Sequence, residues 1–133
     1  MSDYLLDTNV LVLHLREKQG VPTLLDHWSQ VHELCISVAT RVEILAGMRP
    51  REEQVTIHLL NSMTNLPVHK AIADRAGRLI YEQAQKGRQV SFPDALITAT
   101  ALEHDLTLVT TNVRHFVSLL GERVMALSQA LVT

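Results

Sequence analysis

Short apolar runs alternate along this chain with longer segments in which apolar side chains recur every three or four residues. The short runs predict β-strands at residues 3–7, 33–37, 66–69, 106–110 and 123–127. The longer segments predict helices at residues 8–18, 22–30, 39–48, 52–64, 71–86 and 92–104. This alternation is typical of an α/β domain, so we expect three layers, with a central, mainly parallel sheet flanked by helices.

Polar residues follow several of these runs. Asp7 ends the first run, Glu43 lies beyond the second, and Asp94 opens the last long helical segment. Thr110 ends the run at residues 106–110, and Asn112 follows it. Because ligands of open parallel sheets bind beyond the carboxyl ends of the strands, we expect these side chains to form one acidic pocket.

Taken singly, each of these residues also has an interpretation as part of a helix cap. The residues with the composition or spacing of a cap are Asp7 with Thr8 and Asn9, Thr40 with Glu43, Ser91 with Asp94, and Thr110 with Asn112. Thr40 with Glu43 and Ser91 with Asp94 have the spacing of a capping box. For any one residue alone, the structural and the functional interpretation both stay open.

Taken together, the carboxylates favour a metal site. Carboxylates brought close together repel each other, and burial raises the free-energy cost of their charge. A hard cation between Asp7, Glu43 and Asp94 offsets both costs, and Mg²⁺ or Mn²⁺ prefers oxygen ligands of this kind. Such an ion can orient a phosphodiester, lower the pKa of a bound water and neutralise charge in the transition state.

Composition narrows the picture further. With 133 residues, 47% of them hydrophobic and 20% charged, the chain is expected to form a single globular domain over residues 1–133. The net charge of −2 gives no global basic signature, so any contact with nucleic acid requires a local basic patch.

Cys35 is the only cysteine and lies in an apolar run, which predicts a buried structural thiol and excludes a disulfide framework. No apolar stretch approaches the roughly 20 residues of a membrane span, so we expect a soluble, cytoplasmic protein.

Four stretches of the chain combine into one specific pattern. They are Leu5–Val10, Ile36–Gly47, Asp94–Leu102 and Leu108–Phe116. In order and spacing they resemble the motifs of PIN-domain ribonucleases, specifically the VapC-type toxins of type II toxin–antitoxin pairs. The resemblance covers nearly the whole chain.

The resemblance implies a PIN-like fold, a homodimer, a cognate antitoxin as partner, and endonucleolytic cleavage of RNA by a metal-activated water. Asp7, Glu43 and Asp94 match the metal-binding acids of the family, with Mg²⁺ as the expected ion and Mn²⁺ as the alternative. Thr110 matches a hydroxyl near the metal, and with Asn112 it would orient the water or the scissile phosphate. Asn112 stands where many relatives carry Asp. Its amide offers an oxygen but no charge, which argues against a tightly held second ion and leaves the number of ions open.

Contacts with the RNA backbone require cationic side chains. The arginines that flank the acidic positions are Arg41, Arg49, Arg51, Arg88 and Arg114. Arg41 and Arg114 are the strongest candidates because they are close in sequence to Glu43 and Asn112. His115, three residues after Asn112, is the one histidine whose position suggests a role at the site.

The segment at residues 52–64 provides a candidate surface for the antitoxin. Ile57 falls outside the main apolar stripe of this predicted helix. If its side chain is exposed, the region suits a groove that binds a partner helix.

Three other functions fit parts of the pattern. An Asp at the end of the first strand also resembles haloacid-dehalogenase phosphatases, but Asn9 stands where that family has its second Asp. A receiver-like signalling module also gathers acids at strand ends, but here the run at 66–69 ends in His69. A PIN fold that binds RNA without cleaving it stays open because of Asn112.

Overall fold

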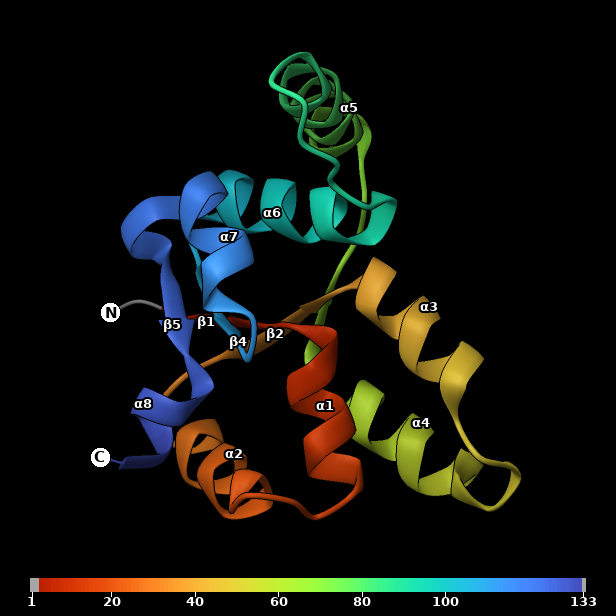
Figure 1. Ribbon diagram of the computed structural model, residues 1–133. Coiled ribbons are helices and arrows are strands. Elements are labelled where there is room, and N and C mark those ends of the chain that lie inside the picture. The colour runs from red at the N-terminus through yellow and green to blue at the C-terminus, as the bar shows by residue number, and fades with distance from the viewer. Residues whose placement is uncertain (1–2, 133) are drawn as a thin grey trace.

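A five-stranded, wholly parallel sheet forms the centre of the molecule in the computed structural model, which describes residues 3–132 (Figure 1). The strands are β1 (Tyr4–Leu6), β2 (Leu34–Ser37), β3 (Thr64–Leu66), β4 (Thr107–Thr110) and β5 (Val124–Ala126). Their order across the sheet is β3-β2-β1-β4-β5, which puts β1 in the middle with β2 and β4 beside it. The predicted α/β architecture with a parallel sheet is therefore confirmed.

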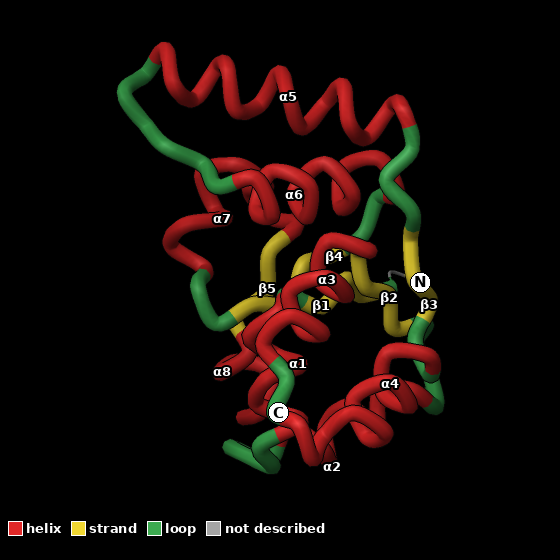
Figure 2. The backbone as a smooth tube through the Cα atoms, turned by 90° about the vertical axis from the view of Figure 1, so that its right-hand side faces the viewer, coloured by secondary structure: helices red, strands yellow, loops and turns green. Residues whose placement is uncertain are grey.

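Helices cover both faces of the sheet (Figure 2). The helices that pack on one face are α1 (Thr8–Leu15), α2 (Val21–Ser29), α3 (Val38–Gly47), α4 (Glu53–Asn61) and α8 (Leu127–Val132). On the other face lie α6 (Phe92–His104) and α7 (Val113–Leu120), and α5 (Lys70–Gln85) packs on the outer side of α6. Two 3₁₀ turns, Pro50–Glu52 and Gly121–Arg123, complete the described elements.

Successive residues of the central strands point to opposite faces, as the pleat of a strand requires. Leu6 and Val109 join the core formed with α1, α2 and α4, whereas Leu5 and Leu108 join the core formed with α6 and α7. All four side chains are fully buried. Burial on both faces explains why the strands form continuous apolar runs in the sequence rather than alternating ones.

One strand lies earlier in the chain than predicted. The pattern placed it at residues 66–69, but β3 spans Thr64–Leu66 and pairs with β2 through Leu66 beside Ser37. Pro67 has no N–H to give to a ladder, which favours the end of the strand at Leu66. Asn65 also holds the entry to the strand in place, because its side-chain amide donates to the carbonyls of Leu60 and Met63.

Two helices were not among the predicted segments, namely α7 and α8. The helix predicted at 8–18 ends at Leu15, since Glu17 and Gln19 adopt the left-handed conformation. The helix predicted at 52–64 ends at Asn61, where the Ser62 hydroxyl donates to the carbonyl of Leu59.

The Cys35 thiol is buried in the core beneath α6, as predicted. Burial, reinforced by the carboxylates of Glu33 and Asp3, raises the pKa of this thiol to about 12. A thiol with such a pKa stays protonated and unreactive at neutral pH. None of the described helices combines the length and the hydropathy needed to cross a bilayer.

Candidate active site

Asp7 lies at the carboxyl end of the central strand β1, where it also caps helix α1. Its Oδ1 accepts a hydrogen bond from the backbone N–H of Thr8 at 2.8 Å, and its Oδ2 accepts one from Thr110 Oγ1 at 2.7 Å. Only 6% of the residue is exposed. Burial raises the pKa of Asp7, and the negative charges of Asp94 and Glu43 raise it further, although the two hydrogen bonds oppose the shift. Asp94 and Glu43 are thus both close enough to Asp7 to disfavour its charge.

Glu43 approaches this position from α3, in the second turn of the helix. Its Oε1 accepts a hydrogen bond from the Thr8 hydroxyl at 2.7 Å. Thr8 therefore links the two acids, since its N–H binds Asp7 and its hydroxyl binds Glu43. Helix α3 begins directly after β2 because the Ser37 hydroxyl accepts from the backbone N–H of Ala39. This tight strand-to-helix junction brings Glu43 to the carboxyl edge of the sheet.

Asp94 comes from the first turn of α6, which follows a loop rather than a strand. Its backbone N–H donates to the Ser91 hydroxyl at 3.2 Å, so Ser91 caps the helix. Its Oδ2 lies 3.0 Å from His115 Nε2, which comes from α7. Both side chains are about 30% exposed, at 31% for Asp94 and 28% for His115. The imidazole therefore lies against one side of the carboxylate, and the rest of the carboxylate is partly accessible.

Thr110 and Asn112 complete the group at the end of β4. The buried Thr110 hydroxyl donates to Asp7 and accepts from the backbone N–H of Asn112 at 2.9 Å. Asn112 occupies the N-cap position of α7, but its side chain makes no capping hydrogen bond. The exposed amide of Asn112 is therefore available to a ligand.

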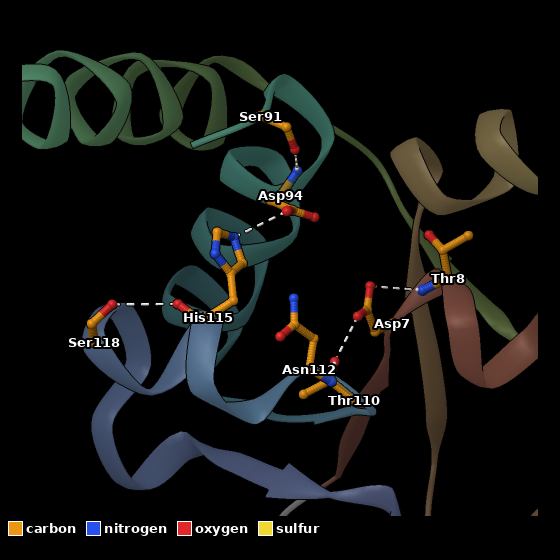
Figure 3. Close-up of polar contacts among 8 residues, drawn as sticks. All are labelled: Asp7, Thr8, Ser91, Asp94, Thr110, Asn112, His115 and Ser118. Atoms are coloured by element: carbon orange, nitrogen blue, oxygen red, sulfur yellow. Dashed lines mark hydrogen bonds and ion pairs between the residues drawn. The ribbon is translucent and has the colours of Figure 1, made fainter. Parts of the chain in front are cut away.

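The side chains of Asp7, Asp94 and Asn112 face a shared space (Figure 3). In residues 3–132, no three carboxylate, imidazole or thiol side chains converge closely enough to enclose an ion directly. No described cationic side chain pairs with Asp7 or Glu43. Apart from the His115 imidazole beside Asp94, no described cationic side chain offsets the negative charge of the site, which suits a hydrated cation that retains some of its waters.

The two arginines predicted to contact RNA lie in different environments. Arg41 donates from its two terminal nitrogens to Asn65 Oδ1 and Asn61 Oδ1, each at 3.0 Å. These amides hold the guanidinium against the end of α4. Arg114 is exposed at the start of α7, and within the described residues no hydrogen bond or ion pair engages its side chain.

The structure separates the capping interpretations that the sequence left open. The capping box proposed for Thr40 and Glu43 is wrong, because the N-cap of α3 is Ser37 and Glu43 instead accepts from the Thr8 hydroxyl. For Ser91 and Asp94 the cap is present, and Asp94 additionally faces the site.

Sequence reasoning did not assign functional roles to Thr8 and Ser91. The sequence did contain signals for both. Thr8 directly follows Asp7, and Ser91 lies three residues before Asp94.

Comparison with known proteins identifies the family. The model of the PIN domain matches residues 4–118. The chain is also similar to Ribonuclease VapC10 of Mycobacterium tuberculosis, with 36% identity over 112 residues that cover 84% of each chain. The chain belongs to the PIN-domain family, among the VapC ribonucleases. Membership excludes the phosphatase and the receiver-like interpretations of Asp7.

Solved structures agree with this assignment of the PIN fold. A toxin–antitoxin complex from Klebsiella pneumoniae has a chain with 28% identity and a TM-score of 0.77, covering 92% of this chain and 96% of that one. DNA-bound VapBC from Salmonella typhimurium gives a TM-score of 0.82 at 24% identity, covering 95% of this chain and 98% of that one. The latter likeness shows the fold.

Proposed function

We propose that this PIN-domain protein is a Mg²⁺-dependent endoribonuclease and the toxin of a toxin–antitoxin pair. Asp7, Glu43 and Asp94 would hold one Mg²⁺, directly or through water, and Mn²⁺ could take its place. The observation that carries the proposal is the approach of three carboxylates from β1, α3 and α6, with Asp7 buried and no described cation paired with it. The ribonuclease names of its relatives indicate RNA as the substrate.

The donor set fits such an ion. Burial and mutual repulsion both disfavour the ionised form of Asp7 in the metal-free protein. A divalent cation reverses this preference, because opposite charge stabilises the carboxylates it approaches. The ion supplies a Lewis acid that activates water and neutralises charge on the phosphodiester in the transition state.

The side chains around the acids orient the reacting groups. Thr8 and Thr110 fix both oxygens of Asp7 through hydrogen bonds, so the carboxylate cannot rotate freely. Thr110 also accepts from the backbone N–H of Asn112 and so fixes the backbone from which its side-chain amide extends. The amide N–H₂ of Asn112 donates to a phosphate oxygen or to the attacking water. By resemblance to the PIN-domain ribonucleases, hydrolysis is expected to leave a 5′-phosphate and a 3′-hydroxyl.

The antitoxin has a candidate docking groove between α2 and α4. A depression of about 530 Å³ lies there, lined in part by Pro22, Leu25, Val55 and Leu59. Val55 is 64% exposed, and Ile57 on the same helix is 36% exposed. The depression also has polar walls that include Asp26, Glu33 and His58, so it suits an antitoxin segment with an apolar face and polar flanks. The complex from Klebsiella pneumoniae supports an antitoxin partner for a protein of this fold.

We further propose that the toxin is a homodimer acting on cytoplasmic RNA. Tyr81 on α5 and Phe92 at the start of α6 are 66% and 71% exposed. Exposed aromatic side chains of this kind are enriched in protein interfaces.

Cleavage of RNA by the purified chain tests the proposal. We expect wild-type protein to cleave a mixed RNA substrate in Mg²⁺, and EDTA to abolish the activity. Asp7→Asn and Asp94→Asn are each expected to lower the rate by at least about 100-fold, because losing an ion ligand costs more than losing an outer-shell partner. Asp74→Asn is a matched control, since Asp74 is an exposed acid on α5 away from the site.

The ends of the products distinguish the remaining alternative. Ligation-based sequencing that requires a 5′-phosphate should recover the cut sites from wild-type reactions. RNA binding by wild-type protein without new ends would instead favour a PIN fold that binds and does not cleave. Undiminished cleavage by Asp7→Asn would overturn the assignment of the site.

A further inference from the structure

A depression lined by both polar and apolar side chains begins at Asp94 and runs along α7. Two adjoining hollows form it, one of about 640 Å³ that reaches Ser91 and Asp94, and one of about 220 Å³ that reaches Arg114 and Ser118. Arg88, Gln89, Val90 and His115 line both hollows. The hollows therefore join into one groove between the loop at residues 86–91 and α7, which we call the α7 groove.

Two arginines in the walls of the α7 groove carry charge that no described acid neutralises. Arg88 and Arg114 are exposed, and neither side chain forms an ion pair within residues 3–132. By contrast, four other arginines do have side-chain partners among the described residues. These pairs are Arg16 with Glu52, Arg75 with Glu103, Arg123 with Asp105, and Arg41 with two amides. The charge at Arg88 and Arg114 is thus free to bind an external anion.

The backbone places Arg88 at this wall. Helix α5 ends in a turn in which the N–H groups of Lys86 and Arg88 both donate to the carbonyl of Gln83. Gly87 adopts a φ of 74°, in the left-handed region that favours glycine at a helix end. Gln83 itself is buried. The start of the loop is therefore anchored to α5, and Arg88 extends from an ordered turn.

Arg114 has a comparable anchor on the opposite wall. It is the second residue of α7, two positions after Asn112, and the neighbouring His115 contacts Asp94. The groove thus joins a carboxylate of the proposed metal site to two unpaired guanidinium groups. A ligand that fills it must carry negative charge along its length and also reach the metal site. A polynucleotide strand has both properties, because each nucleotide contributes one phosphate.

We infer that Arg88 and Arg114 bind backbone phosphates of the RNA strand beside the scissile bond, with the strand lying in the α7 groove. This inference rests on the proposed function. It changes the expected RNA contacts, because Arg88 joins Arg114 and replaces Arg41, whose guanidinium already binds Asn61 and Asn65. Phosphate contacts position a strand without reading its sequence, so this groove contributes affinity rather than target choice.

Binding of a fluorescent single-stranded RNA measures the contribution of the groove. The experiment uses the full chain in the Asp7→Asn background, so that the RNA stays intact, and varies the salt concentration. Removing one arginine–phosphate interaction should reduce the slope of log affinity against log salt by about 0.7, so Arg88→Ala/Arg114→Ala should reduce it by about 1.4. At a fixed moderate salt concentration, the double variant should bind about tenfold more weakly.

Charge-conserving and remote variants serve as controls. Arg88→Lys/Arg114→Lys should retain most of the salt dependence, because lysine still binds phosphate as a point charge. Arg78→Ala removes an exposed arginine that lines a separate hollow with Asp74, Glu82 and Glu103, and it should bind RNA as the parent does. With Asp7 restored, the double alanine variant should show a higher KM but a kcat at saturating RNA close to that of wild type.

The outcomes separate failure of this inference from failure of the proposed function. If wild-type protein cleaves RNA and the double variant keeps the parental affinity and salt slope, the inference is wrong and the nuclease assignment stands. An acidic peptide can serve as a second anionic probe. If the double variant binds RNA as its parent does but no longer binds this peptide, the inference is wrong and the nuclease assignment stands. If wild-type protein neither cleaves nor binds RNA, the proposed function itself has failed. An unchanged Tm of the double variant would show that weaker binding does not come from unfolding.

Discussion

At the scale of single residues, two threonines organise the acidic site. The backbone N–H of Thr8 donates to Asp7 and its hydroxyl donates to Glu43, while the hydroxyl of Thr110 donates to Asp7 and accepts from the N–H of Asn112. Neither residue carries charge, yet together they determine the orientation of one buried carboxylate. An acid held in this way has little rotational freedom to lose when it takes up an ion, which favours tight binding.

Replacement of Thr110 tests this arrangement. Thr110→Val keeps the shape of the side chain but removes both hydrogen bonds, so we expect a decrease of about 2 kcal/mol in the free energy of unfolding. Because the Thr110 hydrogen bond lowers the pKa of Asp7, its removal should raise that pKa further. Thr110→Ser retains the hydroxyl and should lose much less stability. Urea denaturation of both variants gives the comparison, and equal stabilities would contradict the role of the hydroxyl.

His14 predicts a pH dependence that is independent of the acidic site. Burial lowers the pKa of His14 below its ordinary 6.5, although Glu17 opposes the shift, and its Nδ1 has no hydrogen-bond partner among the described residues. The folded state therefore binds this proton less readily than the unfolded state does. The contribution of His14 to stability is complete above pH 6.5 and decreases as the pH falls towards the lowered value.

The measurement is thermal unfolding of wild type and His14→Leu between about pH 7.5 and pH 5, a range that spans the ordinary pKa of histidine. We expect the Tm of wild type to fall more steeply on acidification than that of His14→Leu. Parallel curves for the two proteins would show that His14 does not contribute to this dependence.

At the scale of elements, the site depends on where helices begin. Helix α3 begins at a tight junction capped by Ser37, and α6 begins at a cap formed by Ser91. The Ser37 cap fixes the first turn of α3, which precedes Glu43. The Ser91 cap fixes the first turn of α6, which carries Asp94. The carboxylates therefore meet because of helix starts and strand ends, rather than because of strand ends alone.

Removal of the α6 cap should affect both the helix and Asp94. Ser91→Ala leaves the backbone N–H of Asp94 without its described acceptor and should lower the free energy of unfolding by about 1 kcal/mol. It should also weaken RNA cleavage, because the first turn of α6 positions Asp94. Ser91→Thr keeps an acceptor and should retain both stability and activity. A Ser91→Ala enzyme with wild-type stability would show that the cap contributes little.

Local patterns predicted much of the fold for a physical reason. Strands buried on both faces must be apolar, so β1, β2 and β4 stand out in the sequence. The end of β3 was also predictable, since Pro67 ends the ladder. Helix α7 was missed although its apolar residues, such as Phe116 and Leu120, are buried in the core.

Local sequence patterns could not predict contacts between segments that are distant in the chain. The site acids were predicted because their positions repeat a family pattern. The partnership of Thr8 with Glu43 joins residues 35 positions apart, and Arg41 is engaged by amides 20 and 24 positions away. Likewise, the two sides of the α7 groove come from a loop and a helix separated by all of α6 and β4.

At the scale of the whole molecule, the sheet order concentrates negative charge at one edge. β1 lies at the centre with β2 and β4 on either side, so elements that follow all three strands contribute to the site. The net charge of −2 makes the overall electrostatic attraction of RNA weak. Attraction must therefore be local, and in our inference Arg88 and Arg114 supply it by binding backbone phosphates. In this account, a bound ion both stabilises the fold and completes the site.

Binding of Mn²⁺, followed by electron paramagnetic resonance of the free ion, tests the central claim most directly. We predict that wild-type protein binds one ion per chain and that Asp7→Asn and Asp94→Asn lose this binding. Asp74→Asn, at an exposed position on α5, should bind as wild type does. Undiminished binding of Mn²⁺ by Asp7→Asn would contradict the claim that these carboxylates form the metal site.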